Sequence, residues 1–390
     1  MYAALIFSGC GLFGQSPEKK LNRVWETLIF PLQEKHTHAC SFVELPNGDM
    51  LAAWYYGSGE RNADDVKILG SRLKKGSKTW SDTFLLADSP GLPDCNPVLF
   101  LNGQHTLFLV WIAVQANMWE YSILRLRRSN DYSGQNAPLW NWQDDILLKP
   151  GDLFASEIAL KLHGIEKNEN GSTEKIARYD SLLLDGSRDP GKRCIGWMTR
   201  IQPLRLENGR LLLPLYSDRY SLSLIAISDD DGMTWRASLP IVGRGNVQPA
   251  LVRKKDGHIF AFMRDNGAQP SRVQFSESAD EGETWTAASK SDIPNTASVE
   301  LKVLKDGRWA YVGNDIDDGR YKLSLYLSDD EGRTWKWKKA IEWVGKGEGS
   351  FSYPCLLQTS DGLLHISYSY SLGKTGESIK YIVVDLTSTD

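Results

Sequence analysis

One eight-residue pattern recurs three times in the second half of the chain and constrains the fold more than any other feature. The pattern is Ser-x-Asp-x-Gly-x-Thr-Trp, and its copies occupy 228–235, 278–285 and 328–335, so that successive copies start 50 residues apart. Weaker copies end at Trp80 and Trp140. Repetition with a period of roughly 20–50 residues is typical of propellers and solenoids. We therefore expect a series of similar structural units.

The residue types of the repeat fit a structural role. Asp caps backbone N–H groups in a tight turn, Gly supplies the positive φ that the turn needs, and Trp packs back between neighbouring units. This pattern predicts no direct chemistry for the repeated Asp residues. It also explains part of the chain's high content of 14 Trp, because full or weakened copies of the repeat end in this residue.

Runs of β-branched and aromatic residues, separated by turn dipeptides, precede each full copy. In one unit the runs cover 248–252, 258–263 and 272–278, with Asp256-Gly257 in a turn. Four antiparallel strands in about 50 residues make up a propeller blade. The sequence thus predicts an all-β, six-bladed β-propeller, with first strands at 39–45, 97–101, 198–206, 247–252, 298–304 and 353–358.

Two further segments complete this prediction of one propeller over residues 21–390. The last blade lacks its own copy of the repeat, and Asn22–Phe30 is expected to supply its outer strand and close the ring. An irregular insertion of about 147–194, which includes the loop 168–172, separates blades two and three. Long insertions in propellers usually form loops beside the binding face, and we expect the same here.

The N-terminal residues 1–20 are expected to form an export segment. A short apolar run leads to Ser8-Gly9-Cys10, which resembles the lipobox of bacterial lipoproteins, although no basic residues precede it and the run is short. This interpretation predicts a lipid anchor at Cys10 and a periplasmic or cell-surface location in a bacterium. An ordinary N-terminal segment is the alternative.

Charge and metal-ligating residues narrow the functional classes. The chain has 45 Lys and Arg against 49 Asp and Glu, a net charge of −4, which argues against a nucleic-acid binder driven by basic charge. The five Cys and six His show no metal-ligand spacing, so we expect neither a metal nor another cofactor, and buried free thiols instead. The oligomeric state is not indicated.

The repeat on a six-bladed ring resembles the sialidase superfamily, in particular its bacterial branch with BNR or Asp-box repeats. Segments 38–48, 262–267, 276–278, 293–295 and 350–354 carry the resemblance, which extends over the chain after about residue 35. It implies a glycosidase acting on sugars that bear a carboxylate at the anomeric carbon. In this superfamily three arginines hold that carboxylate, a Tyr activated by a Glu is the nucleophile, and an Asp is the acid/base.

The resemblance assigns roles to individual residues of this chain. Tyr353 matches the nucleophile, and Arg264 and Arg320 match the second and third arginines. Asp65 falls where the acid/base belongs, with Asp64 as the alternative. A phenol suits such a substrate, because a carboxylate nucleophile would be repelled by the sugar's own carboxylate.

Two departures from the superfamily pattern open other possibilities. His38 stands where the first arginine is expected, and no carboxylate occurs near Asn246 and Gln248, where the activating Glu belongs. We therefore expect Glu60 or His38 to act as the base, Arg200 to supply a third positive charge, and Asn246 and Gln248 to contact substrate. For each of these residues, an ordinary packing or solvated role is the alternative.

The leading hypothesis is an exo-acting glycosidase that removes a terminal acidic sugar from glycans. A second hypothesis is a glycosidase or lyase for a uronate-containing polysaccharide, in which His38 is the acid or base. A third is a non-catalytic carbohydrate-binding propeller, which the missing Glu permits. Tyr55 and Trp119 are candidates for stacking on a sugar ring, whereas Trp54, in an apolar strand, is expected in the core.

Overall fold

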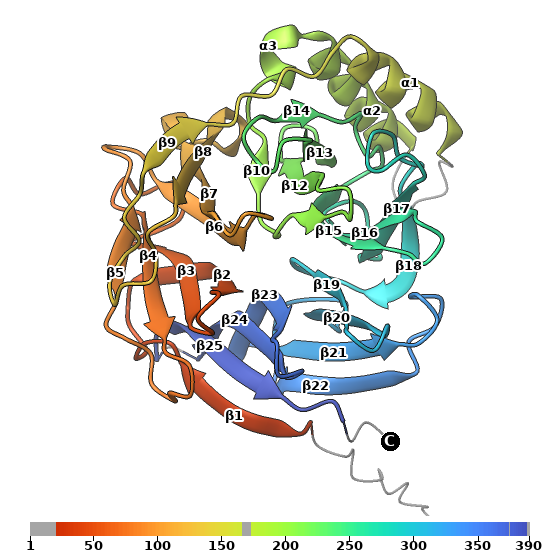
Figure 1. Cartoon of the computed structure of the whole chain (residues 1–390). Helices are drawn as coiled ribbons and strands as arrows, with labels where there is room; N and C mark the ends of the chain where they lie inside the picture. The colour runs from red at the N-terminus through yellow and green to blue at the C-terminus, as the bar shows by residue number, and fades with distance from the viewer. Residues whose placement is uncertain (1–20, 166–172, 374, 388–390) are drawn as a thin grey trace, which may run out of the picture.

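The computed structural model describes residues 21–165, 173–373 and 375–387, so the predicted segment 1–20 with Cys10, and the loop 168–172, lie outside the described residues. In the described part, the strands form six antiparallel sheets around a central axis (Figure 1). The predicted six-bladed propeller is therefore confirmed. Within each blade the innermost strand lies at the axis and the outermost strand at the rim.

The blades follow one another along the chain. Blades one to three contain β2 (His36–Glu44), β3 (Met50–Gly57), β4 (Lys67–Leu73) and β5 (Phe84–Ala87); β6 (Asp94–Leu101), β7 (Leu107–Val114), β8 (Ser122–Ser129) and β9 (Trp142–Asp145); and β10 (Met198–Thr199), β11 (Leu204–Arg205), β12 (Leu211–Ser217), β13 (Leu222–Ser228) and β14 (Arg236–Ala237). Blades four to six contain β15 (Asn246–Arg253), β16 (Ile259–Asp265), β17 (Arg272–Ser278) and β18 (Ser289–Pro294); β19 (Glu300–Val303), β20 (Trp309–Asn314), β21 (Lys322–Ser328) and β22 (Trp337–Trp343); and β23 (Gly349–Gln358), β24 (Leu364–Leu372), β25 (Glu377–Val384) and β1 (Arg23–Leu28).

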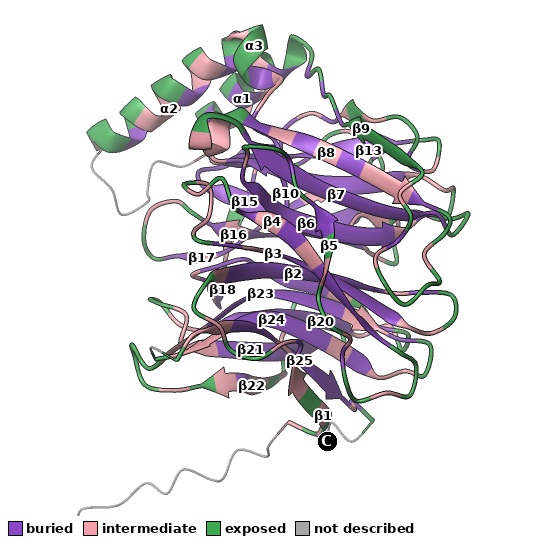
Figure 2. Ribbon diagram, turned by 90° about the vertical axis from the view of Figure 1, so that its left-hand side faces the viewer, coloured by how far each residue is buried: buried purple, intermediate pink, exposed green. Residues whose placement is uncertain are grey.

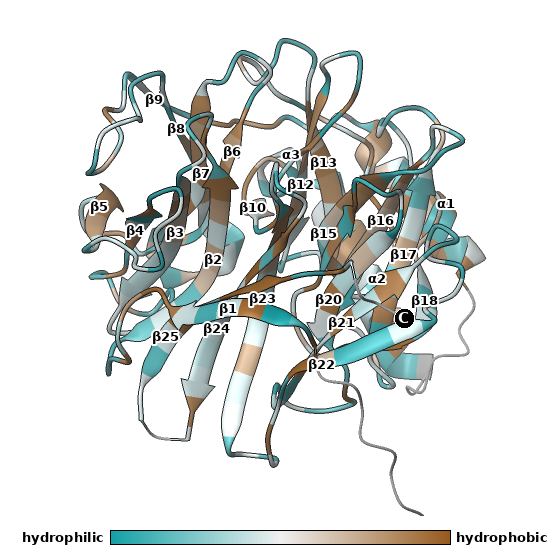
Figure 3. Ribbon diagram, turned by 60° about the horizontal axis from the view of Figure 1, so that its bottom comes forward, coloured by the Kyte–Doolittle hydropathy of each residue, from teal (hydrophilic) through white to brown (hydrophobic). Residues whose placement is uncertain are grey.

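The strands near the axis are buried on both faces, because each blade packs between two neighbours. All residues of β7 are buried, whereas the rim strand β1 alternates between partly buried and exposed positions (Figure 2). Figure 3 shows the same division, with hydrophobic stretches along the strands and hydrophilic loops around them. Uninterrupted apolar runs in these strands therefore reflect two-sided burial.

The Asp boxes form the structural turns that the sequence predicts. In blade three, the Asp230 carboxylate accepts hydrogen bonds from Thr234 N at 2.8 Å and Thr234 Oγ1 at 2.6 Å, and Gly232 has a φ of 96°. The Trp335 ring of the blade-five box lies 5.8 Å from the Phe262 ring of blade four. The box thus caps one turn and packs its Trp against the preceding blade.

The ring closes through the N-terminal strand, as predicted for Asn22–Phe30. β1 pairs antiparallel with β25, and Trp25 lies opposite Val383. Blade six is thereby built from both ends of the described chain, with its inner three strands from the C-terminal side.

The expectation of an irregular insertion was wrong, because the segment between β9 and β10 is largely helical. It contains α1 (Leu153–Gly164), α2 (Thr173–Arg188) and α3 (Pro190–Arg193). In α1 the apolar residues Phe154, Ile158 and Leu162 recur every four positions and are buried, which is the pattern of an amphipathic helix. None of the helices in the described part is long and apolar enough to cross a membrane.

The two ends of the propeller carry different features. Each Asp box follows a third strand, for example β13, whereas the turn before that strand lies at the opposite end of the sheet. The helical insertion joins the rim strand β9 to the inner strand β10 and therefore begins and ends at the end opposite the Asp boxes. Figure 2 shows α1 and α2 beyond the edge of the sheets, with exposed outer faces.

Candidate active site

Four inner strands contain a bulge at which a residue other than Gly adopts a left-handed conformation. In the described chain these residues are Ala39 (φ 56°), Asn96 (49°), Gln248 (56°) and Tyr353 (56°), and the pairing with the second strand shifts register at each. Such a conformation costs about 1 kcal/mol or more and is found mainly where function requires it. The bulges therefore mark the axis as a functional region.

Proline follows three of these bulge residues directly. Asn96-Pro97, Gln248-Pro249 and Tyr353-Pro354 each place a residue without an N–H group where the ladder of hydrogen bonds is already interrupted. A bulge redirects the neighbouring side chain. Here Asn96, Gln248 and Tyr353 all line one cavity on the axis.

The cavity has a volume of about 220 Å³, and residues from the inner strands and loops of all six blades form its walls. Its lining residues are His38, Tyr55, Glu60, Asn96, Trp119, Tyr216, Asp218, Val247, Gln248, Arg264, Asn266, Arg320 and Tyr353. Pockets for drug-sized ligands usually measure roughly 300–1,000 Å³. The cavity is thus on the scale of one sugar unit rather than of a polysaccharide chain.

Tyr353 lies at the centre of this arrangement. Its hydroxyl oxygen accepts hydrogen bonds from Arg264 Nη1 at 3.1 Å and from Gln248 Nε2 at 3.3 Å. The Arg320 guanidinium carbon is 5.4 Å from the Tyr353 ring centroid, and the His38 ring centroid is 4.0 Å away. The Tyr353 oxygen therefore faces cationic and neutral donors, and no carboxylate of the described residues bonds to it.

The two arginines that line the cavity, Arg264 and Arg320, pair with no carboxylate of the described residues. Within the described ranges, neither Arg264 nor Arg320 forms an ion pair, and Arg320 Nη1 only contacts Ser352 Oγ at 3.4 Å. Arg264 Nε is buried without a hydrogen-bond partner. Guanidinium groups bind carboxylates through strong, often bidentate, charge-assisted hydrogen bonds. The guanidinium groups of Arg264 and Arg320 are therefore available to bind an anion in the cavity.

Arg200 is buried behind Tyr353 and does not line the cavity. Its side chain is almost fully buried, its Nη2 donates to the Pro354 carbonyl at 2.9 Å, and its guanidinium lies 5.0 Å from the Tyr353 ring centroid. The predicted third positive charge is thus close to the nucleophile candidate, but it orients Tyr353 and does not reach the cavity surface.

Glu60 is held by neighbours on one side of the cavity. The Tyr55 hydroxyl donates to Glu60 Oε1 at 2.6 Å, and His36 Nε2 lies 3.5 Å from the same oxygen. Burial alone would raise the pKa of Glu60, but its contact with the charged His36 and its hydrogen bond from Tyr55 lower it to about 2. Burial also opposes the protonation of His36, yet its contacts with Glu377 and Glu60 raise the pKa of His36 to about 9. These residues form an ionised network near neutral pH.

His38 is the neutral imidazole of the site. Burial, followed by the positive charges of Arg320, His36 and Arg200, lowers the pKa of His38 well below its usual range. A bound anion on the arginines would offset part of this effect, because it adds negative charge beside them.

Three residues expected at the site lie outside the cavity. Asp65 is exposed and binds Lys35 Nζ at 2.8 Å, which, with the Ser58 hydrogen bonds, lowers its pKa. Asp64 is exposed and accepts from Asn117 Nδ2 at 2.9 Å. Asn246 is fully buried, and its Nδ2 donates to the Ile241 carbonyl. Each of these side chains is bonded to a residue outside the cavity lining, and Gln248 instead contacts Tyr353.

The aromatic candidates divide between core and cavity. Trp54 is buried and stacks on Phe30, as expected for a core residue. Tyr55 lines the cavity mainly as the partner of Glu60, and Trp119 lines it with Arg61 positioned 5.4 Å from its ring centroid.

Five lining residues were not predicted from the sequence, namely Asn96, Tyr216, Asp218, Val247 and Asn266. Asn96 could have been found, because Asn96-Pro97 repeats the residue-Pro pattern of two other inner strands. Tyr216 and Asp218 belong to the end of β12 and the turn that follows, where no motif marks them. No group of three or more His, Cys, Asp or Glu able to hold a metal occurs in the described ranges.

Comparison with known proteins places this fold and site in a class. The six-bladed ring, its Asp boxes and the arginine-lined axial cavity define a sialidase-like β-propeller. The chain belongs to the BNR repeat-like domain family, which matches residues 48–160 and 193–366. The predicted family membership is thus confirmed.

Curated relatives match part of the chain. An anhydrosialidase of Macrobdella decora is 28% identical over 178 residues, which is 41% of this chain and 23% of that protein. A sialidase of Vibrio cholerae is 29% identical over 198 residues, which is 42% of this chain and 25% of that protein. The matched segment therefore spans about a quarter of the length of these relatives.

Solved structures match almost the whole chain in fold. A protein of unknown function from Dyadobacter fermentans has a TM-score of 0.68 at 17% identity, covering 94% of this chain and 99% of that one. The NanB sialidase of Streptococcus pneumoniae has a TM-score of 0.67 at 13% identity, covering 93% of this chain and 71% of that one. At these identities the likeness concerns the fold alone.

Proposed function

We propose that the protein is an exo-acting glycoside hydrolase that removes a terminal acidic sugar, of the sialic-acid type, from glycans. The observation that carries this proposal is the placement of Arg264, Arg320 and Tyr353 around one small axial cavity. Two arginines without carboxylate partners suit a sugar carboxylate, and the limited volume suits one terminal residue. The sialidase relatives support the same reaction class.

In the proposed reaction, Arg264 and Arg320 bind the sugar carboxylate and place the anomeric carbon near Tyr353. The Tyr353 oxygen attacks this carbon as the bond to the leaving oxygen breaks. Arg264 Nη1 and Gln248 Nε2, which already donate to the phenol oxygen, stabilise negative charge that develops there before the bond forms.

His38 is our candidate for the group that takes the Tyr353 proton. It packs directly against the Tyr353 ring, and its neutral form can accept a proton. Glu60, the other candidate, is bonded to Tyr55 and His36 instead. Binding of the substrate carboxylate to Arg320 would favour protonation of His38, because Arg320 is the largest charged contribution that opposes it.

A direct assay tests the proposal. Purified protein is incubated with α-2,3- and α-2,6-sialosides and with Kdn and Kdo glycosides, and free sugar is quantified by chromatography. We expect release of the terminal acidic sugar, with internal positions of a polysaccharide left intact. Sugar binding without release from any of these substrates would contradict the proposal and favour a carbohydrate-binding propeller.

One observation favours a second candidate, a lyase or glycosidase acting on uronate-containing polysaccharides. Tyr353 has His38 against its ring and no carboxylate bonded to it within the described residues, and a Tyr–His pair beside arginines could also remove a proton next to a carboxylate. The same assay with uronate polysaccharides distinguishes the two, because elimination yields an unsaturated product with a new ultraviolet absorbance.

A further inference from the structure

The proposed reaction needs a proton donor for the leaving oxygen, and the structure offers one that the sequence did not indicate. Among the described residues that line the cavity, the carboxyl groups are those of Glu60 and Asp218. Asp65, which the family resemblance implied, is exposed and paired with Lys35 outside the cavity. The choice is therefore between the two lining residues.

Glu60 is poorly suited to donate a proton. Its Oε1 accepts a short hydrogen bond from Tyr55 and lies 3.5 Å from His36, whose other ring nitrogen contacts Glu377 at 2.9 Å. These contacts lower the pKa of Glu60 to about 2 despite its burial. Glu60 is ionised at any pH near neutrality and is engaged by two residues that would have to be released first.

Asp218 differs from Glu60 both in its bonded partners and in the direction of its pKa shift. It is partly buried at the cavity wall, and no described residue forms a hydrogen bond or ion pair with its carboxyl group. Burial raises the pKa of Asp218; Arg264 opposes this shift, and the negative charge of Glu120 adds to it. The titratable and charged groups that face Asp218 come from four elements: Arg264, Arg61, Glu60, Glu120 and Tyr216.

The turn that carries Asp218, residues 217–221, is anchored on both sides of this residue. Arg219 Nη2 donates to the Glu120 carbonyl of blade two at 2.9 Å, and its guanidinium lies 5.3 Å from the Tyr121 ring centroid. The Asp218 backbone is thereby tied to the loop that also carries Trp119 at the cavity.

The helical insertion holds the other side of the turn. Tyr220 is buried, its ring lies 5.7 Å from that of Phe154 in α1, and its hydroxyl donates to the Gly186 carbonyl of α2 at 3.2 Å. The turn is therefore fixed between blade two and the insertion, which gives the insertion a role in shaping the site. A fixed backbone is what a proton donor needs for alignment with the leaving oxygen.

We infer that Asp218 is the catalytic acid/base that protonates the leaving oxygen, an inference that rests on the proposed function. In the first step, the Tyr353 proton passes to His38, the Asp218 proton passes to the glycosidic oxygen, the bond from this oxygen to the anomeric carbon breaks, and the Tyr353 oxygen bonds to that carbon. In the second step, the Asp218 carboxylate takes a proton from water, the resulting hydroxide bonds to the anomeric carbon, and the bond from this carbon to the Tyr353 oxygen breaks. His38 returns its proton to Tyr353, and Asp218 is protonated again at the end.

The test compares leaving groups in the isosteric variant Asp218→Asn. With an aryl glycoside, the phenolate leaves without help, whereas a sugar alcohol must be protonated as it leaves. We expect kcat/KM to fall by about 10²–10⁴-fold for a sialoside with a sugar leaving group, and by less than about 10-fold for the aryl glycoside. The aryl substrate is also expected to show a burst of phenol, because water attack on the intermediate is slowed.

Two further measurements separate this role from a structural one. The alkaline limb of the kcat/KM profile for the sugar substrate is expected to disappear in Asp218→Asn. The variant Asp317→Asn, which changes a largely exposed carboxylate on the β20–β21 loop outside the cavity lining, serves as the matched control and should keep the wild-type ratio between the two substrates. Melting temperatures of both variants check folding.

The outcomes that would overturn the inference are distinct. Equal losses on both substrates in Asp218→Asn, or no loss on either, would exclude Asp218 as the acid. Selective loss on the sugar substrate in Asp65→Asn instead would assign the proton donor to Asp65. If the wild-type protein turned over neither substrate, the proposed function itself would fail, and this assignment with it.

Discussion

Asp280 at the Asp-box end of the propeller and Asp218 at the cavity end have opposite surroundings. In the Asp box of blade four, Asp280 accepts hydrogen bonds from Ser278 Oγ at 2.8 Å and from Thr284 N and Oγ1 at 2.9 and 2.6 Å. Burial would raise the pKa of Asp280, but these bonds lower it. Asp218, at the cavity end, lacks such partners among the described residues, and its pKa is raised.

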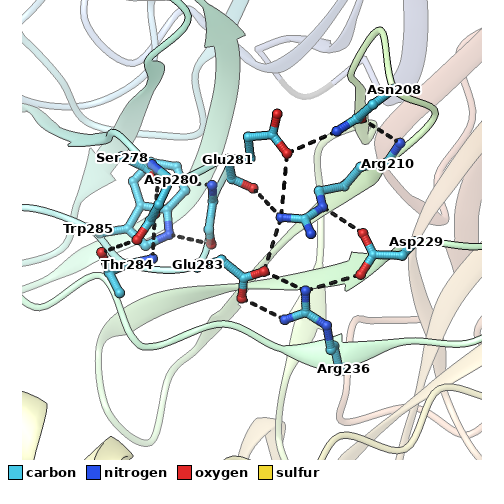
Figure 4. A network of polar contacts seen from close by, with 11 residues as sticks. Asn208, Arg210, Asp229, Arg236, Ser278, Asp280, Glu281, Glu283, Thr284 and Trp285 are labelled. Carbon is cyan, nitrogen blue, oxygen red and sulfur yellow. Dashed lines mark hydrogen bonds and ion pairs between the residues drawn. The ribbon is translucent and has the colours of Figure 1, made fainter.

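The arginines show the same contrast. Beside the blade-four box, Arg210 pairs with Asp229 at 2.6 Å and with Glu283 at 3.0 Å, and Arg236 bridges the same two carboxylates (Figure 4). This network ties blade three to blade four. Arg264 and Arg320 have no such partners within the described chain. The two arginines beside the box are neutralised by internal carboxylates, whereas the two arginines that line the cavity remain available to a ligand.

The largest effect that would test this comparison is expected for Tyr353→Phe. Removal of the nucleophilic oxygen should lower kcat/KM by at least about 10³-fold, because no other group can form the covalent intermediate. The ring and its contacts with His38 and Arg200 are kept, so the free energy of unfolding should change by no more than about 1–2 kcal/mol. Activity assays and thermal unfolding measure both. Retained turnover would show that Tyr353 is not the nucleophile.

A smaller effect is expected from matched changes of one arginine at each end. Arg264→Gln should lower kcat/KM by about 10²-fold, since a charge-assisted bond to substrate is lost, with little effect on stability. Arg210→Gln should leave kcat/KM near the wild-type value and reduce the free energy of unfolding by about 2 kcal/mol, because Asp229 and Glu283 lose a partner. If both variants lowered kcat/KM, or if both lowered the free energy of unfolding, the contrast between the two ends would be contradicted.

The smallest effect is expected for the pH dependence of stability that comes from His36. Together with Glu60 and Glu377, His36 forms a structural ion cluster at the cavity end. The folded state raises the pKa of His36 from 6.5 to about 9, so it favours the protonated form. The resulting stabilisation is complete below about pH 6.5 and is lost as the pH rises to about 9. We expect a loss of about 1–2 kcal/mol over this interval, allowing for partial exposure. Urea unfolding across the interval measures it, and the loss should be absent in His36→Gln.

Much of the fold could be predicted because its signals are local. The Asp-box turn depends on residues within eight positions of one another, and the Asn-Gly or Asp-Gly turns between strands act over shorter distances still. The closing strand 22–30 was also predictable, since blade six otherwise lacked its fourth strand. The insertion was misjudged because the buried stripe of α1 faces a partner far away in sequence, the turn around Tyr220.

The site was predictable to a lesser extent. The family resemblance singled out Tyr353, Arg264 and Arg320, and the structure brings these three together at one cavity. The carboxylate that reaches the cavity was not predicted. Asp65 and Asp218 both belong to loops at the cavity end, and their sequences do not reveal which side chain turns inward.

The sequence by itself determined the repeating blade and the number of blades, because turn chemistry and strand alternation depend on near neighbours. The resemblance of the sequence to a known family, and not these local signals, singled out Arg264, Arg320 and Tyr353. The tertiary structure alone decided which groups share the cavity and which carboxyl group lacks a partner. That decision depends on long-range contacts: Lys35 holds Asp65 outside, while blade two and the helical insertion fix the turn that presents Asp218.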